Sequence, residues 1–147
     1  MLFRSRATGT NIVSSQYNFG AAELAFIGQN YIHLDHDQNW TASAGAAYIF
    51  NQQSPWATRV SADFILGSGL RASRVTPNDT ALPAYAVVNL SAAQKMPVGA
   101  KGDATIRFDV LNAFDHSYML RDGSGVGVGA PQWGQRRTFL VTLSKKF

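Results

Sequence analysis

The sequence predicts an all-β protein, an antiparallel meander of about six strands. Apolar and polar side chains alternate along several stretches, as they do in strands that have one apolar and one polar face. The 147 residues are 46% hydrophobic and include 13 glycines. Such an intermediate composition is typical of barrel strands, because each strand has one apolar and one polar face. Long and short connections also alternate along the chain.

The first three predicted strands end at connections marked by Gly, Pro and Asn; they are Thr10 to Phe19, Thr41 to Phe50 and Arg59 to Gly67. The third has one of the clearest alternations. We read Gly20 to Asn39 as one long surface connection, a length that is usually functional. Its apolar patch, Ala21 to Ile27, fits either a helical turn or two or a continued strand.

The last three predicted strands are Tyr85 to Lys95, Thr105 to Leu111 and Arg137 to Phe147. A loop from Ser68 to Pro83 precedes them, and a glycine-rich segment separates the last two. Alternation predicts one common apolar face, formed by Val60, Phe64, Ile106, Phe108, Val141 and Leu143.

The alternation of long and short connections is typical of outer-membrane barrels, which have short periplasmic turns and long extracellular loops. Aromatic residues also fall at two levels, as interfacial girdles require. Tyr48, Phe50 and Trp56 lie at the level of Phe147, and Tyr17, Phe19, Tyr85, Tyr118 and Phe139 lie at the other. Aromatics beside ordinary turns of a soluble sheet are the alternative.

Several motifs, in order, resemble the C-terminal end of TonB-dependent outer-membrane receptors. They are Asn112, Phe114, Asp115 and Tyr118, the loop from Arg121 to Gln132, the Arg136-Arg137 pair and the terminal Phe147. The resemblance continues upstream through residues 31–38, 61–63, 67–71 and 82–85. Ala113 and Lys145 depart from the residues usual at their positions.

The resemblance implies that residues 1–147 are the C-terminal part of a receptor barrel in the cell outer membrane. A complete member has about 22 strands and an N-terminal plug, and takes up siderophores, cobalamin, carbohydrates or similar cargo. The implied partners are outer-membrane lipid, the barrel assembly machinery, the rest of the barrel and the plug. TonB would act only through the N-terminal part that is missing here. Phe147 would be the assembly signal.

The start of the chain, Met1 to Arg6, leads into polar residues without the apolar stretch of a signal peptide. We therefore expect a longer parent protein or a truncated reading frame. The alternative, from another class, is a small autonomous β-sheet protein that binds a partner. Six strands fall short of the eight or so that the smallest membrane barrels need.

Charged side chains supply the candidate binding sites. Five arginines adjoin the long connections and could form a cationic rim that binds anionic cargo, or could pair with acids such as Asp79 and Asp122; they are Arg71, Arg74, Arg121, Arg136 and Arg137. A second cluster has ligand types that suit a divalent metal, although a solvated polar loop explains it better; it is His33, Asp35, His36 and Asp37.

Asp63, Arg107 and Asp109 fall on the predicted polar face, where pairing among them is the favoured reading. The sequence predicts neither catalysis nor a cofactor, because no nucleophile motif or placed acid-base pair occurs. The net charge of +4 comes without a basic run, which argues against nucleic acid. The chain has no cysteine and so no disulfide.

Overall fold

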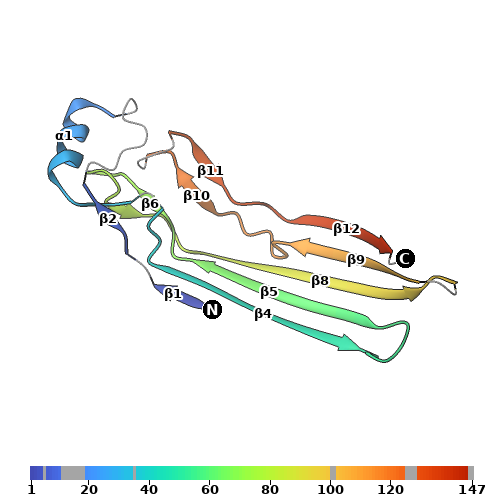
Figure 1. Cartoon of the computed structure of the whole chain (residues 1–147). Helices are drawn as coiled ribbons and strands as arrows, with labels where there is room; N and C mark the ends of the chain where they lie inside the picture. Colours follow the sequence, from blue (N-terminus) through green and yellow to red (C-terminus); the bar gives the residue numbers. More distant parts are fainter. Residues whose placement is uncertain (5, 11–18, 35, 100–101, 125–128, 146–147) are drawn as a thin grey trace. The chain divides into compact units, whose positions relative to one another are not determined.

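The computed structural model describes the chain except for residues 5, 11–18, 35, 100–101, 125–128 and 146–147. Its main feature is a six-stranded antiparallel sheet with the order β1-β4-β5-β8-β9-β12 (Figure 1). The strands are β1 (Leu2–Arg4), β4 (Trp40–Phe50), β5 (Thr58–Gly67), β8 (Tyr85–Pro97), β9 (Asp103–Leu111) and β12 (Thr138–Lys145). Neighbours in the sheet follow one another in the sequence, which confirms the predicted meander. The sheet is not closed.

The five strands predicted from residue 41 onward are present, with small shifts at their ends. The predicted first strand, residues 10–19, lies mostly outside the described residues. Beside β4 stands instead the short strand β1, in which Leu2 pairs with Ala42 and Arg4 with Trp40. Three residues are too few to show a period of two, so alternation could not indicate this strand.

The register of β9 and β12 confirms the predicted face for four residues. Phe108 lies opposite Val141, and Ile106 lies opposite Leu143, so the four share one side of the sheet. Thr142 pairs with Arg107 on the other side. In β5, alternation sets Val60 and Phe64 opposite Arg59, Ser61 and Asp63, which line a hollow together with Arg107. The sheet therefore has one apolar and one polar face.

The connections confirm the predicted alternation of short and long. The connections from β4 to β5 and from β8 to β9 are short, whereas those from β5 to β8 and from β9 to β12 are long. The long connections were predicted as simple loops, but small hairpins form inside them. These are β6 (Arg71–Ala72) with β7 (Thr80–Ala81), and β10 (Met119–Asp122) with β11 (Pro131–Trp133). Another pair is β2 (Thr8–Gly9) with β3 (Ile32–His33).

The long connection from Gly20 to Asn39 contains a helix, α1 (Ala21–Gln29), which decides the open reading of Ala21 to Ile27. The alanines have high helix propensity, and Glu23 accepts a hydrogen bond from the Gly20 N–H at 2.9 Å, which satisfies a donor at the helix start. Among the described residues, no helix is long and apolar enough to cross a lipid bilayer.

The chain divides into two compact units. The loop unit comprises residues 1–42, 66–85 and 117–134, and the strand unit comprises residues 43–65, 86–116 and 135–147. In the loop unit, Ile27 and Ile32 form a small buried core against which Phe19 and Phe26 pack. In the strand unit, the apolar face stays exposed: Phe108 is 44% accessible, and Leu143 is 73% accessible.

Candidate functional site

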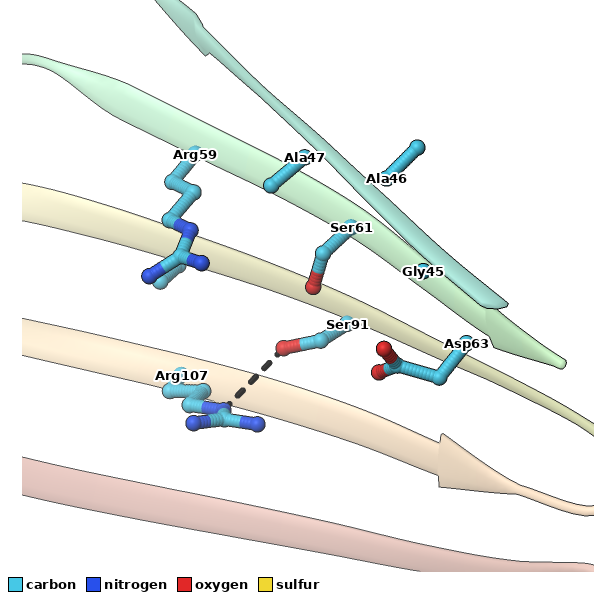
Figure 2. A pocket seen from close by; sticks show the side chains of 9 residues that line it. Gly45, Ala46, Ala47, Arg59, Ser61, Asp63, Ser91 and Arg107 are labelled. Atoms are coloured by element: carbon cyan, nitrogen blue, oxygen red, sulfur yellow. Dashed lines mark hydrogen bonds between the residues drawn. The ribbon is translucent and has the colours of Figure 1, made fainter. Parts of the chain in front are cut away.

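The polar face of the strand unit contains a hollow of about 400 Å³. Strands β4, β5, β8 and β9 each contribute side chains to it (Figure 2). The lining residues are Gly45, Ala46, Ala47, Arg59, Ser61, Asp63, Ser91, Ala93 and Arg107. Figure 2 shows Ser61 and Ser91 between the arginines and Asp63. The hollow is therefore built from rigid strands and has both signs of charge.

Small side chains create the space. Alanine, serine and glycine occupy positions on the three neighbouring strands β4, β5 and β8 where larger residues would fill the face. A side chain at position 45 would displace the Asp63 carboxylate, because a Cβ there would lie 2.5 Å from Oδ1 of Asp63. The glycine thus lets the Asp63 carboxylate lie across β4.

Arg107 is held in place from two sides. Its Nη2 lies 2.7 Å from Oδ1 of Asp109, and its Nε donates to the Ser91 hydroxyl at 3.0 Å. Among the described residues, Arg59 and Asp63 have no ion-pair or hydrogen-bond partner. The predicted pairing on the polar face is therefore confirmed for Arg107 and Asp109, and wrong for Asp63.

Three of the five predicted rim arginines belong to the loop unit, where each has a partner. Arg71 is largely buried and donates to Asp37 and Asn39 at 3.3 and 3.0 Å. Arg74 forms an ion pair with Asp122 at 2.8 Å, as the alternative reading proposed. Arg121 bonds to His36. Acidic or polar partners thus reduce the free charge that these arginines offer.

Arg136 and Arg137 belong to the strand unit. Arg136 forms a bidentate ion pair with Asp115, in which Nε donates to Oδ1 at 2.8 Å and Nη2 donates to Oδ2 at 2.6 Å. The Arg137 guanidinium lies over the ring of Phe139, 5.9 Å from its centre. Because the five arginines divide between the two units, their gathering at one end stays a prediction.

The predicted metal ligands are engaged with protein groups. Asp37 accepts from Arg71 and from the Ala7 N–H, and its Oδ2 lies 2.5 Å from Nδ1 of His33. Asp35 lies outside the described residues. Among those described, no three side chains of ligand type gather to hold a metal ion. The metal site therefore stays a prediction, and the observed network instead holds Ala7, His33 and Arg71 together.

The motif around Asn112 forms a tight turn, and the sequence did not predict the hydrogen bonds that hold it. Asn112 is 2% accessible and has a left-handed backbone with φ of 49°. Its Nδ2 donates to the carbonyls of His116 and Gln135 at 2.9 Å, and its Oδ1 accepts from the His116 N–H at 3.0 Å. One side chain thus joins the end of β9 to the approach of β12.

Asp115 completes this turn, also with a left-handed φ of 53°. The Arg136 guanidinium, and then the Arg137 N–H, hold the pKa of its carboxyl well below the usual range. In the loop unit, N–H groups of Thr76, Arg74 and Val75 likewise lower the pKa of Asp79. Both carboxylates therefore order polar loops. The sequence signal that could have indicated these turns was the presence of Asn and Asp in the connections, because these residues favour turns and tolerate a left-handed backbone.

Phe147, the predicted assembly signal, lies outside the described residues. Comparisons with models of known protein families, with curated protein sequences and with solved structures gave no match.

Proposed function

We propose that the chain is the C-terminal part of the barrel wall of a TonB-dependent outer-membrane receptor, which takes up scarce cargo such as siderophores. The observation that carries this proposal is the exposed apolar face of the sheet. Val141 and Leu143 on β12 are 69% and 73% accessible, and Ile106 and Phe108 beside them on β9 are 42% and 44% accessible. An apolar patch of this extent on neighbouring strands needs a covering, and lipid would supply it.

The lengths of the strands support the same proposal. β4, β5, β8 and β9 have 11, 10, 13 and 9 residues. A tilted strand needs about 9 to 11 residues to cross the hydrocarbon core of a bilayer. The opposite face has hydroxyls and charges at Ser61, Asp63, Ser91 and Arg107, which suits a barrel interior.

The open edges of the sheet support a role as one part of a larger barrel. Within the described part of the chain, β1 and β12 are the end strands, and each has one neighbour in the sheet. In lipid, unpaired backbone N–H and C=O groups cost several kcal/mol each, roughly, so an open sheet is unfavourable there. Further strands of the receptor would pair with these edges, and the plug and TonB would belong to that larger assembly.

Fractionation of cells that express the chain behind an added secretion signal tests this proposal. We expect the chain to stay in the outer-membrane fraction after a high-salt and alkaline wash, and to leave it only with detergent. The alternative, an autonomous soluble β protein, predicts the chain in the aqueous fraction without detergent. Folded chain in the aqueous fraction, with strand content by circular dichroism, would overturn the membrane assignment.

A further inference from the structure

We propose that the hollow on the polar face binds a small molecule that has a carboxylate or phosphate at one end and hydroxyl or ammonium groups at the other. The inference rests on the residues of the strand unit that line the hollow, and it does not depend on whether the apolar face meets lipid. It adds a ligand site to a chain whose proposed role is that of a barrel wall.

Arg59 and Arg107 form the anion-binding end. They stand on β5 and β9, which are separated by β8, so their backbones lie about 10 Å apart. Asp109 and Ser91 fix the Arg107 guanidinium, so it loses little conformational freedom when a ligand binds. Arg59 has no acidic partner among the described residues, which leaves its charge available for an oxyanion.

Asp63 forms the opposite end. It follows Arg59 by four residues on the same face of β5, a separation of about 14 Å along the strand. Its carboxylate accepts hydrogen bonds only, so it selects hydroxyl or ammonium groups. Ser61 and Ser91 lie between the two ends and offer hydroxyl groups to the middle of a ligand (Figure 2).

The charge pattern also defines what would be excluded. The charge of Arg107 is offset by Asp109, so Arg59 and Asp63 remain as one positive and one negative group at opposite ends. This arrangement favours a dipolar ligand over a polyanion. The volume of about 400 Å³ falls within the range of small-molecule sites, which is about 300 to 1,000 Å³.

Titration calorimetry of the full chain in neutral detergent at low salt tests the proposal, with circular dichroism to verify folding. Three probes separate the two ends: inorganic phosphate, glucosamine, and glucosamine 6-phosphate, which combines both chemistries. We expect glucosamine 6-phosphate to bind at least about tenfold more tightly than either of the other two, because it engages both ends together. Equal affinity for phosphate and glucosamine 6-phosphate would contradict the two-ended site.

Matched variants locate the binding. Arg59→Gln removes the free guanidinium and should weaken both phosphate-containing probes about tenfold or more. Lys145→Gln makes the same charge change on the opposite face, because Lys145 pairs with Ala104 in the register of Ile106 and Phe108, and should leave binding unchanged. Asp63→Asn, close in shape, should remove the advantage of glucosamine 6-phosphate over phosphate.

The opposite results have clear meanings. If Lys145→Gln weakens phosphate as much as Arg59→Gln does, the binding reflects net charge and the hollow is not a site. If no probe binds the folded chain, the proposal is wrong. Because the membrane assignment is tested by fractionation, either result leaves that assignment standing and refutes only the ligand site.

Discussion

The Asn112 side chain stabilises the turn after β9 through three hydrogen bonds to backbone groups of His116 and Gln135. Asn112→Ala would remove the hydrogen-bond partner of these groups in a partly buried site. We expect it to lower the free energy of unfolding by about 2 to 4 kcal/mol. Denaturant unfolding in detergent measures the change.

Phe114→Ala is the control in the same turn, because the Phe114 ring is 78% accessible. We expect a change within about 0.5 kcal/mol. If both variants destabilise the chain equally, the hydrogen bonds of Asn112 do not hold the turn.

Asp115 gives the turn a dependence on pH. Its contact with Arg136 and with the Arg137 N–H lowers the pKa in the folded state below the ordinary value of 3.8. The ionised carboxylate therefore contributes stability fully above that ordinary value, and the contribution is lost as the pH falls through the lowered pKa. We expect the difference in stability between the native chain and Asp115→Asn to be present at about pH 6 and to shrink below about pH 3. A difference that does not vary with pH would contradict this.

The sequence predicted these residues only as parts of a motif. Asn112 and Asp115 were identified by their order along the chain, whereas their function comes from left-handed backbones that let them reach His116, Gln135 and Arg136. The contacts of Asn112 with Gln135 and of Asp115 with Arg136 join residues more than twenty positions apart. A local sequence pattern does not show which residues far apart in the chain come into contact.

At the scale of elements, a glycine beside the β10–β11 hairpin packs against a pair of stacked tyrosines. Tyr118, before β10, stacks on Tyr85 with ring centres 4.5 Å apart. A Cβ at Gly134, after β11, would lie 1.9 Å from the Tyr118 ring. We expect Gly134→Ala to displace the ring and cost about 1 to 3 kcal/mol of stability, measured by denaturant unfolding.

Two comparisons check the cause of that loss. In a Tyr118→Ala background the cost of Gly134→Ala should largely disappear, because the ring that it meets is absent. Gly20→Ala should be nearly neutral, since its Cβ would meet only Glu23 Oε2 at an ordinary 3.7 Å. Full additivity of the Gly134 and Tyr118 changes would show that the two residues do not interact.

The two faces of β12 allow a matched test of the lipid contact. Val141 lies on the apolar face, and Ser144 lies on the polar face, where it pairs with Thr105. We expect Val141→Arg to disfavour membrane insertion by up to about 2 to 4 kcal/mol, depending on depth, and Ser144→Arg to have little effect. The fraction of chain that partitions into phospholipid vesicles measures both. Equal losses would contradict a lipid-facing side.

The elements that the sequence predicted are those with enough residues to show a period. The main-sheet strands β4, β5, β8, β9 and β12 each have eight or more residues, so their faces could be assigned from alternation. Helix α1 spans nine residues and could not be distinguished from a strand by its apolar patch alone. β1 and the hairpins of residues 71–81 have strands of two or three residues, which are set by tertiary contacts.

At the scale of the whole molecule, the two faces of the six-stranded sheet have different chemistry. The polar face supplies the hollow at Arg59, Asp63 and Arg107, and the apolar face of Ile106, Phe108, Val141 and Leu143 supplies the proposed lipid contact. Period-two alternation fixed both faces from the sequence. The hollow was not predicted, because its shape depends on small residues of β4, β5 and β8 that meet only when these strands pair.

Accessibility of spin labels along β12 tests the lipid-facing sheet most directly. The chain has no cysteine, so single cysteines at residues 139–144 can be labelled one at a time in phospholipid vesicles. We predict that oxygen relaxes the labels at 139, 141 and 143 most strongly, while a water-soluble nickel chelate favours 140, 142 and 144. A nickel chelate that reaches both sets equally, or a pattern without a period of two, would contradict the account.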